Sequence, residues 1–123
     1  MPHLTLEYTY NIEQQIDFKD LFAGLHQILA DVGAIRLGNC KSRAVRLVHY
    51  YIADGDSRHA FVHLVIRLLA GRPIEQKQEI TRRSLALLKE AFASSLAEFE
   101  LQISVEIQDI ERSTYSKIPE GTL

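Results

Sequence analysis

Four stretches of the chain have hydrophobic patterns that predict β-strands: residues 3–9, 43–52, 60–69 and 101–108. Hydrophobic and polar residues alternate in the first and the last of these stretches, and the second is rich in Val, Leu and Tyr. In the first of them Leu4, Leu6 and Tyr8 share one face. The third is almost continuously apolar, which is typical of a central strand covered by other elements. Between the second and third, Asp54-Gly55-Asp56 is a turn signal.

Two longer stretches have apolar residues at helical spacing. The first runs from Phe18 to Val32 and has Gly33 just past its predicted end, where glycine is common. The second begins after Gly71-Arg72, with Pro73 suited to a first helical position. Its apolar stripe includes Leu87, Leu88, Ala91 and Phe92. The predicted order of elements is therefore βαββαβ.

This order contains a repeat with an offset of 60 residues, in which apolar positions match apolar positions. We expect one domain over 1–123, with pseudo-repeats at about 2–52 and 62–110 and a polar tail over about 112–123. A right-handed crossover makes the two strands of each unit parallel. The predicted fold is α/β (α+β): a tandem βαβ repeat forming a four-stranded sheet with two helices on one face. Its other face then needs a cover, and self-association is the simplest one.

Composition excludes several classes of protein. Hydrophobic content of 46%, charged content of 24% and a net charge of −2 are ordinary for a soluble domain of 123 residues. Nothing in this balance indicates nucleic acid or an anionic membrane as partner. The single cysteine, Cys40, excludes an intrachain disulfide and suits a reducing cytoplasm. No signal peptide or membrane-spanning run is predicted, so we expect a cytoplasmic protein.

Pro2 is the first candidate for chemistry. If Met1 is removed, the chain begins with a secondary amine at the mouth of the predicted sheet. Desolvation disfavours the charged form of an amine and lowers its pKa. Such a nitrogen, neutral at working pH, is able to accept a proton and deliver it elsewhere. The alternative is that Pro2 only permits removal of the methionine.

The chain resembles the tautomerase superfamily, and nearly its whole length resembles 5-carboxymethyl-2-hydroxymuconate isomerase. The resemblance rests on a proline after the initiator methionine, on two βαβ units and on short segments in a matching order. These segments are Pro2-His3, Lys41-Ser42-Arg43, Ala53-Asp54-Gly55, Ala60-Phe61-Val62-His63 and Ala70-Gly71-Arg72-Pro73-Ile74-Glu75-Gln76-Lys77-Gln78. None of them is specific alone; their order and spacing carry the resemblance.

The resemblance implies a homotrimeric, cofactor-free isomerase acting on a small anionic unsaturated hydroxy-carboxylate from aromatic acid breakdown (homoprotocatechuate degradation). It implies Pro2 as acid and base, and Arg72 as a ligand of a substrate carboxylate. A further cation maps to Lys41 or Arg43, and lysine would lack the bidentate fork of arginine. The alternatives are a tautomerase of another dienol or 2-keto acid, and a non-catalytic trimeric carboxylate-binding protein.

Histidines supply the remaining candidates. His3 and His49 are possible residues of the pocket near Pro2, or they lie on strand faces. His59 and His63 have the spacing of a metal pair on a helix, but they fall in or beside a predicted strand, so no metal site is expected. In the repeat, Val62 stands opposite Pro2 and Ile12 stands opposite Arg72. We therefore expect one site per chain.

Overall fold

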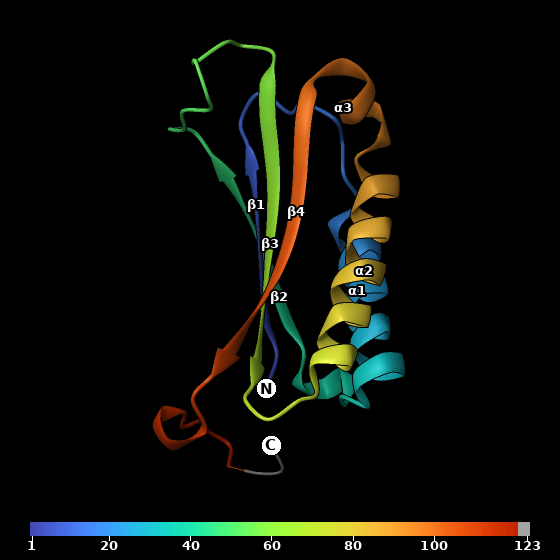
Figure 1. Cartoon of the computed structure of the whole chain (residues 1–123), viewed down its shortest axis with the longest axis vertical. Coiled ribbons are helices and arrows are strands. Elements are labelled where there is room, and N and C mark those ends of the chain that lie inside the picture. Colours follow the sequence, from blue (N-terminus) through green and yellow to red (C-terminus); the bar gives the residue numbers. More distant parts are fainter. Residues whose placement is uncertain (121–123) are drawn as a thin grey trace.

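One four-stranded sheet carries both long helices on the same face in the computed structural model, which describes residues 1–120 (Figure 1). The elements, in chain order, are β1 (His3–Thr9), α1 (Phe18–Gly33), η1 (Leu37–Asn39), β2 (Lys41–Leu47), β3 (His59–Leu69), α2 (Ile74–Ala91), α3 (Ala93–Glu98), β4 (Glu100–Ile110) and η2 (Arg112–Thr114). The βαββαβ order and the placement of both long helices confirm the predicted fold. The two 3₁₀ turns and the short helix α3 were not predicted.

The sheet has the strand order β2-β1-β3-β4. β1 pairs with β2 and β3 pairs with β4 in parallel, whereas the two central strands β1 and β3 are antiparallel, with Leu6 opposite Leu64. Each βαβ unit therefore forms half of the sheet, as the pattern predicts. This topology brings the first residue of β1 beside the last residues of β3.

The core lies between the sheet and the helices. Alternate residues of the central strands are fully buried there: Leu4, Leu6, Val62, Leu64, Ile66 and Leu68. The helices contribute Leu21, Leu25, Leu29, Ile80 and Leu88, and Phe92 follows α2. A repeat of 60 residues would place Leu85 of α2 opposite the buried Leu25 of α1. Leu85 is 41% exposed, however, and the neighbouring Ser84 is buried. In the helices, the matching buried positions are thus 59 residues apart rather than 60.

The second strand differs from its prediction. The run from Val48 to Ile52 is apolar enough to extend a strand, but β2 ends at Leu47. β2 is an edge strand whose single neighbour is β1, and β1 ends at Thr9, opposite Leu47. A longer β2 would have no strand beside it, and Tyr10 N donates the last hydrogen bond to Leu47 O at 2.8 Å.

The end of the first helix also differs in one residue. Gly33 is the last residue of α1, and the left-handed position after it is occupied by Ala34, with φ of 52°. Gly33 serves another purpose: a Cβ there would lie 3.1 Å from Ile35 Cδ1 and 3.3 Å from an Nη of Arg72, and both contacts are tight. The glycine predicted as a helix stop therefore leaves room for the side chains of Ile35 and Arg72.

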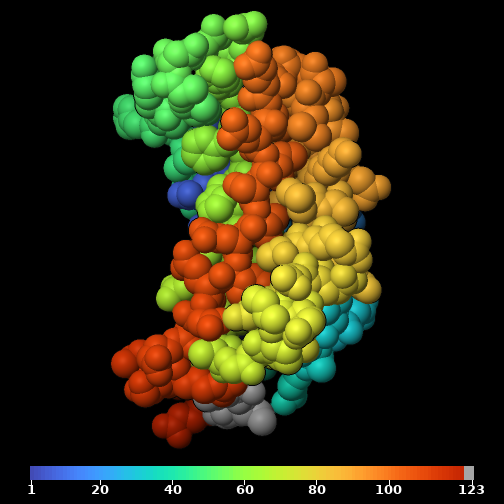
Figure 2. Space-filling model, in the orientation of Figure 1, coloured from blue at the N-terminus to red at the C-terminus, as the bar shows by residue number. Residues whose placement is uncertain are grey.

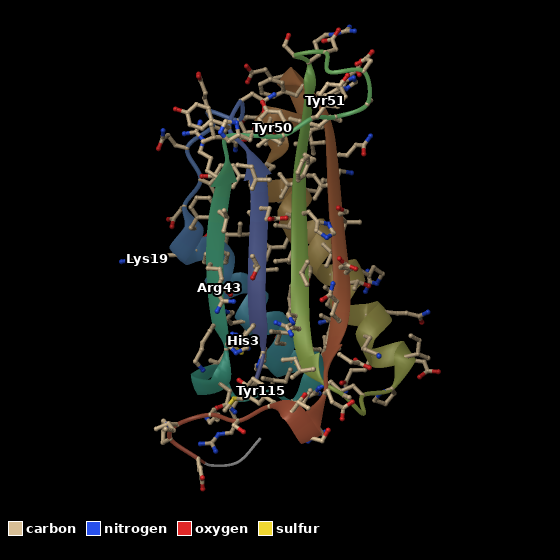
Figure 3. The ribbon with its side chains drawn as sticks, turned by 90° about the vertical axis from the view of Figure 1, so that its left-hand side faces the viewer. His3, Lys19, Arg43, Tyr50, Tyr51 and Tyr115 are labelled. Carbon is tan, nitrogen blue, oxygen red and sulfur yellow. The ribbon has the colours of Figure 1, made fainter. Side chains whose placement is uncertain are left out.

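The sheet face opposite the helices is open and mostly polar. Its side chains include His3, Thr5, Glu7, Arg43, His63 and Arg67 (Figure 3). The molecule is hollowed on this side, between the segment after β2 (green) and the segment after β4 (red; Figure 2). Within the described residues, no helix is both long enough and apolar enough to cross a membrane.

Phe92 offers a test of the core. It is completely buried, and its ring lies 6.5 Å from that of Tyr8, centroid to centroid. We expect Phe92→Ala to lower the free energy of unfolding by about 3–5 kcal/mol, because it leaves a cavity between sheet and helix. Urea unfolding at a fixed protein concentration measures the loss. Leu85→Ala, on the exposed side of α2, should cost much less; equal losses would contradict this description of the core.

Candidate active site

Pro2 is buried at the start of the central strand β1. Its carbonyl oxygen accepts a hydrogen bond of 3.2 Å from Lys41 N, which anchors it to the first residue of the neighbouring strand. Two residues later Leu4 is fully buried, so the strand fixes the position of the N-terminus. The N-terminus lies at the same end of the molecule as the start of α2 and the segment after β4 (Figure 1).

A cavity of about 160 Å³ opens at this end of the sheet. Its apolar wall is formed by Ile35, Leu68 and Leu69. Its polar residues are Arg36, Asn39, Arg72 and Arg112, and the first two residues of the chain complete it. Among residues 1–120 no aspartate or glutamate lines the cavity, so its described lining combines an apolar wall with three guanidinium groups.

Met1 fills part of this space. Its residue is only 5% exposed, and its Sδ lies 3.9 Å from Lys117 Nζ. Burial lowers the pKa of its amino group, and the charges of Arg72, Lys117 and Lys41 lower it further. While Met1 is present the Pro2 nitrogen is an amide and is not basic. In a chain that begins at Pro2, the terminal amine belongs to the next residue, which lines the same cavity as Met1.

Arg72 is held in a fixed position at the junction of β3 and α2. Gly71 has φ of 116°, a left-handed conformation that turns the chain from the strand toward the helix. One Nη of Arg72 donates to Gly33 O at 2.7 Å and to Gln76 Oε1 at 2.9 Å. Burial lowers the pKa of this guanidinium, and the positive charge of Arg112 adds to the effect. A partly desolvated, oriented arginine of this kind is suited to bind a carboxylate.

The two remaining cation candidates have different surroundings. Neither of them lines the cavity. Arg43 lies on the open face, where it donates to His3 Nδ1 at 3.0 Å and to Thr5 Oγ1 at 3.4 Å. Lys41 begins β2, next to Asn39 of the cavity wall, and its Nζ donates to Asn39 O at 3.3 Å. Its charge also lowers the pKa of the amino group at the N-terminus. Lys41 is therefore the candidate nearer to the site.

The histidine candidates are separated by the length of a strand. His3 directly follows Pro2, and its Nε2 lies 3.1 Å from Tyr115 Oη (Figure 3). Since Arg43 donates to Nδ1, the ring carries its proton on Nε2 and donates it to the tyrosine. Burial lowers the pKa of His3, and Arg43 lowers it further, so both favour the neutral ring. His49 follows β2 at its opposite end and does not reach the cavity.

The other candidates serve structural purposes. His59 bridges Asp54, at 3.0 Å, and Glu100, at 3.3 Å. In residues 1–120, no three His, Cys, Asp or Glu side chains are placed to hold a metal ion. Burial raises the pKa of the Cys40 thiol, which disfavours the reactive thiolate.

Three functional candidates were missed in the sequence. Arg112, Tyr115 and Lys117 lie in the segment interpreted there as a polar tail, and all three reach the N-terminal end of β1. The one signal in the sequence was that Arg112 comes shortly after the last strand. Its place in the site depends on the pairing of β4 with β3, which brings the end of β4 beside the end of β3.

Comparisons with known proteins identify the family of the chain. The family model for 5-carboxymethyl-2-hydroxymuconate isomerase matches residues 2–119. The chain is 32% identical over 110 residues to a 5-carboxymethyl-2-hydroxymuconate Delta-isomerase of Escherichia coli, covering 89% of this chain and 87% of that protein.

Solved structures share the fold. A 5-carboxymethyl-2-hydroxymuconate isomerase from Deinococcus radiodurans has a TM-score of 0.85 and 36% identity, covering 94% of this chain and 87% of that one. A fused 4-OT protein, described as a symmetric trimer, has a TM-score of 0.74 at 14% identity, covering 95% of this chain and 92% of that one. The protein is thus an isomerase with the tautomerase fold. It belongs to the 5-carboxymethyl-2-hydroxymuconate isomerase family.

Proposed function

We propose that the protein moves a proton within an unsaturated 2-hydroxy-carboxylate, without a cofactor, and that 5-carboxymethyl-2-hydroxymuconate is its substrate. The name of the E. coli relative supports this substrate. The observation that carries the proposal is a cationic cavity, lined by no acidic side chain, with the N-terminus of the chain in its wall. Such a cavity fits a small anion and places an amine beside it.

Pro2 is the proposed base and acid, once Met1 has been removed. The neutral secondary amine takes the hydroxyl proton of the dienol, the double bonds shift, and the resulting ammonium returns a proton to carbon. The product is a conjugated ketone, and no proton is gained or lost overall. A single group that is deprotonated and then reprotonated is sufficient for this reaction.

Cations stabilise the negative charge that develops on the dienolate. Arg72 is the proposed ligand of one carboxylate, because it is partly desolvated and held by two hydrogen bonds. For the second cation we propose Lys41, whose charge acts on the N-terminal amino group. Arg43 is proposed to position His3 through their 3.0 Å hydrogen bond. Lysine supplies a point charge rather than a fork, so it constrains the second carboxylate less.

The proposed assembly is a homotrimer. The open face of the sheet is polar and hollowed (Figure 2). It is therefore better suited to line the interior of an assembly than to pack directly against a second subunit. Exposed apolar side chains gather instead at the edge strand and after it, at Val45, Val48, Tyr50 and Tyr51. The fused 4-OT relative described as a symmetric trimer supports three copies.

Ketonisation of the dienol tests the proposal directly. We expect the chain that begins at Pro2 to speed the loss of dienol absorbance, with kcat/KM falling as pH drops below an apparent pKa lower than that of an ordinary α-amino group, about 8. The sign follows because burial and nearby cations lower the pKa of the Met1 amino group, and we expect the same effect on the amine of Pro2 in the wall of the same cavity; the neutral amine is the active form. Turnover of other dienols or 2-keto acids alone would favour a different tautomerase. Binding without any turnover would favour a carboxylate-binding protein.

A further inference from the structure

Arg112 is fixed beside Arg72 by the last pair of strands. β4 ends at Ile110, whose carbonyl oxygen accepts a 3.0 Å hydrogen bond from Ala70 N. Arg112 Nε in turn donates to Ala70 O at 2.7 Å. Ala70, two positions before Arg72, therefore fixes both the end of β4 and the Nε of Arg112.

The two guanidiniums face one cavity, and none of the described residues that line it is acidic. Arg112 is close enough to Arg72 to lower its pKa, which is a measure of their mutual repulsion. Among the described residues, the two Nη groups of Arg112 have no hydrogen-bond partner, whereas Arg72 is bonded to Gly33 and Gln76. Two close cations of this kind are unfavourable alone and favourable around a bound anion.

Depth distinguishes the two arginines. Arg72 is half-buried, whereas Arg112 is exposed at the mouth of the cavity, on the segment that follows β4. A substrate whose reacting carbon lies near Pro2 would present its nearer carboxylate to Arg72. An additional carboxylate, on a side arm that points outward, would meet Arg112.

We propose that Arg112 binds this additional carboxylate and makes the site selective for tricarboxylates over dicarboxylates. The inference rests on the proposed function, because it takes the substrate to be an anion bound between Pro2 and Arg72. It assigns substrate selectivity to the segment after β4, outside both βαβ units.

Non-reactive anions test the proposal separately from catalysis. Propane-1,2,3-tricarboxylate and glutarate differ by one carboxyl group, and neither can be ketonised. We would measure both dissociation constants by titration calorimetry on the chain that begins at Pro2. We expect Arg112→Gln to weaken tricarboxylate binding about 10-fold or more and glutarate binding less than about 3-fold, as for loss of one charged hydrogen bond.

Two further variants control for charge and folding. Arg82→Gln makes the same charge change on the outer side of α2, where the side chain is 69% exposed, and should alter neither constant. Arg112→Lys keeps the charge and should recover part of the tricarboxylate preference. Equal weakening of both anions in Arg112→Gln, or no weakening, would overturn the proposal, and so would a wild-type chain that binds neither probe. A chain that fails to ketonise dienols yet shows the expected difference would overturn only the proposed function.

Discussion

Retention of Met1 is expected to lower isomerase turnover by about 10²-fold or more, because a positioned acid–base group contributes about 10²–10⁴ to a rate. The methionine acts in two ways. It converts the Pro2 nitrogen into an amide, and its nearly buried side chain occupies part of the cavity. Release from a cleavable fusion provides two chains, one starting at Met1 and one at Pro2, whose intact masses identify them.

A substitution tests the contribution of the proline itself. Pro2→Ala, with the methionine removed, leaves the cavity open and an amine in place, but a primary one on a less constrained residue. We expect it to lose most turnover while it remains folded and sediments as the parent chain does. Circular dichroism and sedimentation velocity provide these controls. Full activity in Pro2→Ala, or in the chain that keeps Met1, would refute the assignment of Pro2.

Most strands and helices were predictable because each carries a clear hydrophobic pattern. β1 and β4 lie where alternation predicts them, β3 lies where the nearly continuous apolar run predicts it, and α1 begins at Phe18 as predicted. The end of β2 was not predictable from its own residues. The run after Leu47 is as apolar as a strand, and its conformation is decided by where the neighbouring strand ends.

The site was predictable only in part, for a similar reason. Pro2 and Arg72 stand at element boundaries, where sequence patterns are informative, and the cavity brings both together. Lys41 and Arg43 are two positions apart on one strand, so the sequence could not tell them apart. Arg43 is bonded to His3 on the open face, whereas Lys41 lies at the end beside the amine. Arg112 depends on the pairing of β3 with β4, which has no local signal.

The two halves of the repeat differ at the positions that form the site, so a site is expected at only one end of the sheet. Val62 and Ile12, which correspond to Pro2 and Arg72 in the other half, are 0% and 1% exposed. Both are core residues without polar atoms in their side chains, so the other half offers neither an amine nor a cation at these positions. The prediction of one site per chain follows from this asymmetry.

Arg72→Gln is expected to lower kcat/KM at neutral pH by about 10–10²-fold, since one charged hydrogen bond is worth about 1.5–3 kcal/mol. The variant should also change the pH profile. The charge of Arg72 lowers the pKa of the Met1 amino group, and we expect it to act in the same way on the amine of a chain that begins at Pro2. Removal of this charge should therefore move the inflection of kcat/KM toward higher pH. A rise in KM alone would indicate loss of carboxylate binding in the ground state, and a fall in kcat would indicate loss of dienolate stabilisation.

The control variants separate charge from geometry at this position. Arg72→Lys retains the positive charge, so we expect the inflection to stay near that of the parent chain, while KM rises because the fixed fork is lost. Arg82→Gln, an equal charge change on the outer side of α2, should leave both quantities unchanged. If Arg72→Gln and the parent chain share one inflection, the titrating group is not an amine beside Arg72, and the assignment of Pro2 as the base loses its electrostatic support.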